Sequence, residues 1–280
     1  MIVDAHQHFW NPARGDYGWL TPDLPVCRIY GPDDLEPLMR AAGVEATVLV
    51  QAAPTVAETD YILDIARCTP WVLGVVGWID LGAPDAVEQM WTRARDPLFV
   101  GVRPMLQDIA ERDWILRPEL NAVLAQVAAQ ELVFDALVLS DQVGVIDELA
   151  ARHPNLAIVL DHGAKPRLGD VAAMAAWEAD IRRLAERPNV SCKLSGLLTE
   201  LPAGADVAHL KRAAVMVLDA FGAERVLWGS DWPVLTLAGD YGGWRALAQE
   251  IVAAHAPHAL DAVMGGNALR LYGRKRTAKR

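Results

Sequence analysis

The segment IVDAHQHFW, residues 2–10, places two histidines directly after a short apolar run. The run Ile2–Ala5 has the length and composition of a buried strand. An open doubly wound sheet that binds nucleotides would carry a glycine-rich turn after its first strand. This chain carries His6 and His8 at that place, followed by a long loop. Its first strand therefore favours a (β/α)8 barrel over the doubly wound fold.

Short apolar runs of the same kind recur along the chain. The predicted strands are Ile2–Ala5, Ala46–Gln51, Val72–Ile79, Phe99–Pro104, Leu132–Leu137, Ala157–Asp161, Val190–Leu194 and Arg225–Gly229. Most of them are separated by segments with helical spacing and helix end signals: Pro32–Gly43, a helix opened by Pro84 and Asp85, Arg117–Gln130, a helix from Ser140 that ends before Pro154, Gly169–Glu186, Asp206–Phe221, Tyr241–Ala254 and Ala259–Tyr272. Strand–helix alternation repeated about eight times predicts an α/β fold of the (β/α)8 TIM-barrel type.

The composition is typical of one large domain. The chain has 280 residues, of which 52% are hydrophobic, and it shows no repeat and no linker-like segment. Barrels of about 250 residues routinely form a single domain. We therefore predict one barrel domain over residues 1–272, followed by a basic, disordered tail, GRKRTAKR, at residues 273–280.

The charge and the cysteines bear on partners and location. A net charge of −10 argues against a nucleic-acid partner, because phosphate binding needs clustered positive charge. Cys27, Cys68 and Cys192 are widely spaced, which suits a reducing compartment. The sequence shows neither a signal peptide nor a membrane-spanning apolar run. We expect a cytoplasmic protein with no membrane partner, and a homo-oligomer is compatible with the sequence.

The first and last predicted strands carry the strongest candidates for chemistry. His6 and His8 lie on one face of the first strand end, because side chains alternate along a strand. Asp231 follows the last strand, within WGSDWPV at residues 228–234. A closed barrel brings its last strand next to its first, and its active site lies at the carboxyl ends of the strands. We therefore expect His6, His8 and Asp231 to meet.

Other strand ends add polar side chains. Arg103 and His162 emerge from apolar strands, and such groups need partners inside the barrel mouth. Lys193 has two interpretations: a cation that binds substrate, or a buried lysine paired with Asp161 or Asp231. Weaker candidates at the same level are Gln51, Trp78, Asp80, Asp135 and Ser195.

Several familiar motifs are absent from the sequence. It contains no G-x-S-x-G elbow, no P-loop, no G-x-G-x-x-G and no H-E-x-x-H. Covalent serine catalysis and a nucleotide cofactor are therefore not expected. His255 and His258 are interpreted as surface residues, because Pro257 breaks the helical spacing that a metal-binding pair would need.

The motifs taken together resemble the amidohydrolase superfamily. Within it, the chain looks most like the lactonase branch, which opens sugar lactones and pyrone dicarboxylate lactones. The resemblance covers almost the whole chain and rests on DAHQHFW (4–10), RGDYGWL (14–20), GVRPML (101–106), LDHGAKP (160–166), KLSGL (193–197) and WGSDWPV (228–234). It implies the same (β/α)8 barrel, with His6, His8, Asp231 and His162 at the reaction centre.

The chain departs from the two-metal pattern of this superfamily. Arg103 stands where a bridging lysine is usual, and Asp135 stands where many members have a metal-binding histidine. A bridged pair of metal ions is therefore not expected. The resemblance implies one zinc-like divalent ion on His6 and His8, with Asp231 or His162, or no required metal at all, since the lactonase branch includes metal-free members.

These observations predict a carboxylic-ester hydrolase that opens a sugar lactone. Asp231 would activate water as the general base, while His6, His8 and His162 would surround the reacting carbonyl. The predicted substrate contacts are Arg103, Gln51, Lys193, Trp10, Tyr17, Trp19 and Trp232. Two alternatives stay open: a metal-dependent decarboxylase of an aromatic or unsaturated acid on the same barrel, and a non-catalytic barrel that binds a sugar acid.

Overall fold

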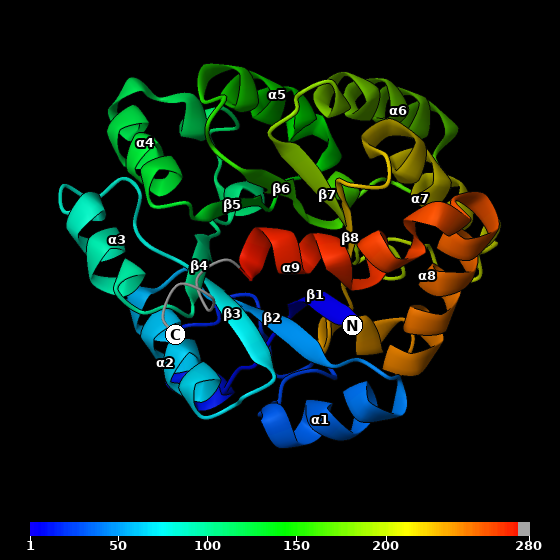
Figure 1. The fold of residues 1–280 in the computed structure, drawn as a ribbon, viewed down its shortest axis with the longest axis horizontal. Helices are drawn as coiled ribbons and strands as arrows, with labels where there is room; N and C mark the ends of the chain where they lie inside the picture. The colour runs from blue at the N-terminus through cyan, green and yellow to red at the C-terminus, as the bar shows by residue number, and fades with distance from the viewer. Residues whose placement is uncertain (274–280) are drawn as a thin grey trace.

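The chain folds into a barrel of eight parallel strands in sequence order. The computed structural model describes residues 1–273, and nearly all of the predicted basic tail lies outside this range. The strands are β1 (Val3–Gln7), β2 (Ala46–Val50), β3 (Val72–Gly77), β4 (Phe99–Val102), β5 (Val133–Ala136), β6 (Ile158–Leu160), β7 (Val190–Leu194) and β8 (Val226–Trp228). Each coincides with a predicted strand, so the (β/α)8 prediction is confirmed (Figure 1).

The last strand closes against the first, as predicted. Gln7 and Trp232 form a parallel bridge. The backbone N–H of Asp231 donates to the carbonyl of His6 at 2.8 Å, and that of His8 donates to the carbonyl of Trp232 at 2.7 Å. The segment after β8 is therefore tied to the end of β1, which is where the candidate site was expected.

Helices surround the barrel between successive strands. They are α1 (Pro32–Ala41), α2 (Val56–Arg67), α3 (Ala86–Ala94), α4 (Asn121–Ala129), α5 (Val143–Arg152), α6 (Val171–Ala185), α7 (Ala208–Phe221), α8 (Tyr241–His255) and α9 (Asn267–Tyr272). Helix α2 was not among the predicted helices. Its start is marked by Thr55, whose side chain accepts a hydrogen bond from the backbone N–H of Glu58 at 3.0 Å. A threonine followed three residues later by glutamate is a recognisable helix start.

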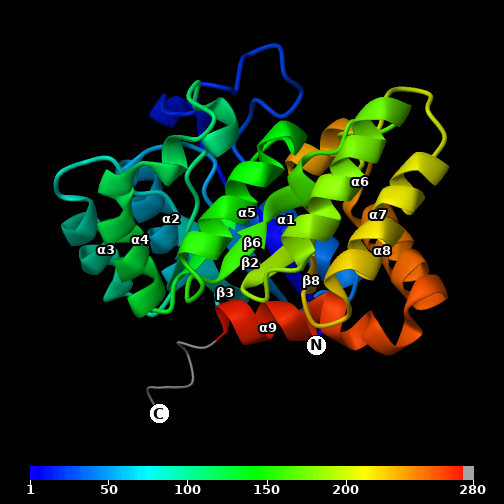
Figure 2. The same cartoon turned by 90° about the horizontal axis from the view of Figure 1, so that it is seen from above.

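The predicted last helix is interrupted. Residues Ala262–Gly266 form a π-helical turn, and only Asn267–Tyr272 is regular. Gly265 lies so close to the carbonyl of Met1 that a Cβ there would overlap it. The break therefore lets the start of the chain pack against this segment. Helix α9 crosses the end of the barrel opposite the long β1–α1 segment (Figure 2).

The layer between strands and helices is apolar, whereas the barrel interior has two levels. Large side chains such as Phe99, Trp177 and Trp244 are buried in that outer layer. Near α9 the interior holds a second apolar cluster that includes Val133, Val159 and Leu227, and towards the carboxyl ends of the strands it is polar. In this polar level, Asp135, Asp161 and Lys193 are each at most 1% exposed. Buried charges need partners, so the polar level is expected to be a connected network. Within residues 1–273, no helix is long and apolar enough to cross a membrane.

Candidate active site

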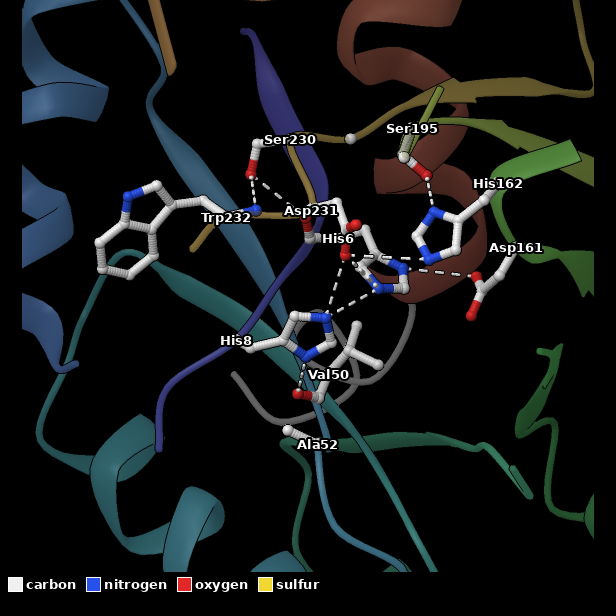
Figure 3. Close-up of polar contacts among 12 residues, drawn as sticks. His6, His8, Val50, Ala52, Asp161, His162, Ser195, Ser230, Asp231 and Trp232 are labelled. Atoms are coloured by element: carbon white, nitrogen blue, oxygen red, sulfur yellow. Dashed lines mark hydrogen bonds and ion pairs between the residues drawn. The ribbon is translucent and has the colours of Figure 1, made fainter. Parts of the chain in front are cut away.

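Two histidines and a carboxylate converge at the mouth of the barrel (Figure 3). His6 Nε2 lies 3.1 Å from His8 Nε2, and His8 Nε2 lies 3.2 Å from Asp231 Oδ1. The third separation, from His6 Nε2 to Asp231 Oδ1, is 3.6 Å. The sequence prediction that these three residues meet is borne out by this geometry. All three are buried, with at most 5% of each residue exposed.

Asp231 is held by a tight turn after β8. Its backbone has a φ of 60°, in the left-handed region that non-glycine residues rarely adopt. The turn is fixed on one side by Asp4, whose Oδ1 accepts from the backbone N–H of Ser230 at 2.8 Å. Tyr241 donates to the other oxygen of Asp4 at 3.0 Å. Asp4 therefore links β1, the turn and α8, and it serves to position the turn.

The charge state of Asp231 follows from its neighbours. Burial raises the pKa of its carboxyl group, but His162, His8 and His6 together lower it by more. The net pKa lies well below the ordinary value for aspartate. Asp231 is therefore an ionised carboxylate at neutral pH, able to accept a proton.

His162 completes a ring of three imidazoles. Its Nε2 lies 3.8 Å from Asp231 Oδ1, and its Nδ1 lies 2.8 Å from the Ser195 hydroxyl. It stands on a left-handed turn in which His162, Gly163, Ala164 and Lys165 all have φ between 50° and 61°. Such a run is costly for L-residues, and strain of this kind is concentrated at functional sites. The turn directs His162 inward from the end of β6.

His6 and His162 are neutral imidazoles at neutral pH, because burial lowers the pKa of each. Burial lowers the pKa of His162 to about 4, despite the nearby Asp231 and Asp161 carboxylates. Burial, assisted by the positive charge of Lys193, lowers the pKa of His6 well below its ordinary value. His8 Nδ1 lies 2.8 Å from the carbonyl of Val50. A carbonyl can only accept, so Nδ1 of His8 carries a proton and donates it to Val50.

This arrangement fits a single divalent metal ion. His6, His8 and Asp231 each offer one ligand atom, and these atoms lie within 4.8 Å of one another. In a tetrahedral zinc site with bonds of about 2.0–2.1 Å, ligand atoms are separated by roughly 3.3–3.4 Å. The observed separations of 3.1, 3.2 and 3.6 Å are close to that spacing. The hydrogen bond of His8 to Val50 is the kind of outer contact that orients a metal-binding histidine.

Two cationic side chains, Lys193 and Arg103, lie against His6 inside the barrel. Lys193 Nζ lies 3.1 Å from both Asp161 Oδ1 and His6 Nδ1, and it also contacts Asp135. Arg103 NH1 lies 3.2 Å from Asp161 Oδ2. Burial raises the pKa of Asp161, but Lys193, His6 and Arg103 together hold it well below its ordinary value. Of the two interpretations of Lys193, the buried lysine paired with Asp161 is the one seen.

A cavity of about 190 Å³, here termed the catalytic cavity, is lined by His8, His162 and Asp231 among others. The predicted site residues that line it are His8, Trp19, Arg103, His162 and Asp231. Those outside its lining are His6, Gln51, Lys193, Trp10, Tyr17 and Trp232. Except for His6, we assign this second group no direct substrate contact.

Each residue of the second group has another role. Gln51 donates through its amide to the carbonyl of Arg103 at 2.8 Å. Trp10 and Trp232 both pack edge-on against Tyr30, and Tyr17 is buried in the same large apolar cluster. These side chains were predicted as substrate contacts because they belong to loops at the barrel mouth. Aromatic side chains on such loops also bury one another, and only the fold reveals which ones do so.

Other residues of the catalytic cavity were not predicted. They are Ala52, Met105, Gln107, Asp108, Leu137, Lys165 and Val234. Lys165 is the most informative, because it brings a positive charge to the same opening as Asp231. It lies three residues after His162 on the left-handed turn, where neither strand nor helix spacing indicates the direction of a side chain. Its sequence signal was its place in LDHGAKP, beside a histidine already singled out.

Comparison with known proteins assigns the family. A sequence profile described as Amidohydrolase matches residues 3–274, nearly the whole chain. The chain belongs to the amidohydrolase family. This amidohydrolase is 45% identical over 275 residues to an L-fucono-1,5-lactonase of Burkholderia ambifaria, covering 96% of this chain and 94% of that one. An L-fucono-1,5-lactonase of Burkholderia multivorans is 37% identical, covering 97% and 96% of the two chains.

A solved relative bears on the metal. The crystal structure of an amidohydrolase from Burkholderia multivorans with bound zinc has a TM-score of 0.92 to this chain and 36% sequence identity. The alignment covers 97% of this amidohydrolase and 99% of that protein. A zinc ion in this relative agrees with the geometric fit of His6, His8 and Asp231 to one divalent ion.

Proposed function

We propose that this amidohydrolase hydrolyses the ring ester of a sugar lactone of the L-fucono-1,5-lactone type, with Asp231 as the general base. The observation that carries the proposal is the ionised Asp231 carboxylate among three buried imidazoles, on the wall of a cavity sized for a small ligand. The two lactonases at 45% and 37% identity support the substrate class. The activity is that of a carboxylic-ester hydrolase.

The residues perform the reaction in two proton transfers. Asp231 takes a proton from a water molecule as the water oxygen attacks the lactone carbonyl. The bond between that carbon and the ring oxygen then breaks, and Asp231 returns the proton to the departing ring oxygen. The product is an open-chain hydroxy acid. Because the leaving oxygen stays tethered to the same molecule, a single carboxylate can serve both steps.

As water attacks, negative charge develops on the carbonyl oxygen of the lactone, next to cationic side chains of the catalytic cavity. Arg103 and Lys165 both line the catalytic cavity and favour a negative oxygen there. When a divalent ion is bound by His6, His8 and Asp231, the chemistry it supplies is polarisation of the carbonyl. His162 is kept in place by the Ser195 hydroxyl.

We further propose that this site takes one ion and not two. The position beneath His6 is filled by the charged ends of Lys193 and Arg103, both paired with Asp161. A second cation there would meet two positive charges in a buried environment, which is strongly unfavourable. Elemental analysis of purified protein is expected to give at most one equivalent of metal, and two equivalents would overturn the proposal. Activity that survives chelation would show that the protein groups suffice without the ion.

The test of the function is an acid-release assay on L-fucono-1,5-lactone. Asp231→Asn is expected to lower kcat about 10²–10⁴-fold, the range typical of a lost general base. Asp33→Asn, which alters an exposed carboxylate in the first turn of α1, serves as the matched control and should keep wild-type rates. Full activity in Asp231→Asn would refute the mechanism. Binding without turnover would favour the sugar-acid binder, and release of carbon dioxide from an aromatic acid the decarboxylase.

A further inference from the structure

A second and larger cavity adjoins the catalytic one. This cavity, here termed the outer cleft, measures about 740 Å³. Trp19, Met105 and Asp108 line both cavities, so the two lie side by side. The remaining walls of the outer cleft come from the loops after β1, β2, β3 and β4, at the same end of the barrel as Asp231. Figure 2 shows the long β1–α1 segment on that side, opposite α9.

The two volumes indicate a substrate longer than one ring. Ligand pockets that enclose a drug-sized molecule measure roughly 300–1,000 Å³. The catalytic cavity, at about 190 Å³, falls below that range and suits a single sugar lactone. The outer cleft, at about 740 Å³, lies well inside it. A monosaccharide lactone that reacts beside Asp231 would leave the outer cleft without a ligand.

The walls of the outer cleft combine indole rings with carboxylates. Trp78 and Trp114 join Trp19 around it, and all three are only partly buried. Trp19 is fixed by a hydrogen bond of 2.8 Å from its indole N–H to the carbonyl of Ala52. Asp80 and Asp108 are exposed carboxylates on the same walls. Within the described residues, the lining of this cleft contains no lysine, arginine or histidine.

This chemistry matches a neutral sugar ring. A pyranose presents C–H groups on its faces, which pack on indole rings, and hydroxyl groups on its rim, which donate to carboxylates. An anionic group would meet Asp80 and Asp108 with no compensating cation, so a charged sugar acid is disfavoured. A purely apolar group would leave both carboxylates to be desolvated without a partner.

We propose that the outer cleft binds a second, neutral sugar ring, and that the preferred substrates are lactones that carry a glycosyl substituent. The inference rests on the proposed lactonase function and extends its substrate class. The lactone ring occupies the catalytic cavity beside Asp231, and the glycosyl group passes Met105 into the outer cleft. Trp78 and Trp114 then act as specificity residues for the second ring and touch no reacting atom.

The test compares lactones with and without the second ring. The best monosaccharide lactone of a screen is prepared with a neutral hexose attached at each free hydroxyl in turn. At least one of these isomers is expected to show a kcat/KM tenfold or more above that of its parent, mainly through a lower KM. If every isomer is turned over less efficiently than the parent, the outer cleft is not a sugar subsite. If the parent itself is not hydrolysed, it is the lactonase function that fails.

Three tryptophan variants separate this role from a structural one. Trp78→Ala and Trp114→Ala are each expected to lower kcat/KM for the glycosylated lactone about tenfold and to leave the parent lactone within twofold. Trp91→Ala removes a 44% exposed indole on α3 that does not line the cleft, and it should change neither rate. Equal losses on both substrates in Trp78→Ala and Trp114→Ala would overturn the proposal. Thermal melting of each variant confirms that it is folded.

Discussion

The close approach of Gly196 to His162 allows the role of that imidazole to be tested without altering it. Gly196 has a φ of +65°, and a Cβ placed on it would lie 2.6 Å from His162 Nδ1 and 2.7 Å from Cγ. Carbon atoms in contact prefer about 3.5–4.0 Å. The variant Gly196→Ala must therefore push the imidazole away by about 1 Å. That movement breaks the 2.8 Å contact of Nδ1 with Ser195 and shifts Nε2 relative to Asp231.

The expected loss of activity follows from this displacement. A misplacement of about 1 Å near the reacting atoms can lower the rate about 100-fold. A 100-fold loss corresponds to about 2.7 kcal/mol in the activation barrier. We therefore expect kcat/KM of Gly196→Ala on L-fucono-1,5-lactone to fall about 100-fold.

Gly204→Ala is the matched control for this variant. Gly204 also has a positive φ, of +76°, but a Cβ on it would meet no atom within 4 Å. Backbone strain should cost each variant about 1–2 kcal/mol of stability, which urea unfolding measures, and Gly196→Ala should lose more because its Cβ also displaces His162. Only Gly196→Ala should lose activity. Activity of Gly196→Ala within threefold of Gly204→Ala would refute the reasoning that His162 must be held in place.

Three further predictions concern buried or lining groups. Burial raises the pKa of Glu58 to about 8 from its ordinary 4.5, so the folded chain keeps a proton that the unfolded chain releases. The stability tied to this proton is complete below pH 4.5 and is lost as the pH rises to 8. The free energy of unfolding of Glu58→Gln, measured with urea, should rise relative to that of wild type by up to about 5 kcal/mol between pH 4.5 and pH 8. A difference between the two proteins that does not change with pH would contradict this. Tyr272→Phe removes a 2.8 Å hydrogen bond to the buried Asp135 carboxylate. The variant should lose about 1.5–3 kcal/mol of unfolding free energy, while its kcat stays within threefold of wild type. An unchanged unfolding free energy would argue against the bond. Lys165→Met should weaken inhibition by the sugar-acid product about tenfold or more, since Lys165 lines the catalytic cavity, and an unchanged inhibition constant would exclude that role.

The fold was largely readable from local patterns. Each strand is a short apolar run between polar segments, and the alternation of these runs with helical segments favoured the eight-stranded barrel that is found. The helix α2 was missed because its apolar positions are mixed with acidic ones, although Thr55 and Glu58 marked its start. The last helix was predicted as continuous, and contact of Gly265 with the distant start of the chain interrupts it. A contact across the whole sequence cannot be inferred from neighbouring residues.

In the candidate site too, some residues were placed correctly from local sequence patterns and others only by the tertiary structure. The sequence by itself determined that His6, His8 and Asp231 meet, because strand alternation and barrel closure are enough to place them. Only the tertiary structure decided which other polar groups face the substrate. Lys193 and Gln51 lie in strands or at their ends and turn into the buried network, whereas Lys165 reaches the cavity from a left-handed turn. The physical reason is that burial and pairing depend on what packs above a side chain, and that packing comes from loops far away in the sequence.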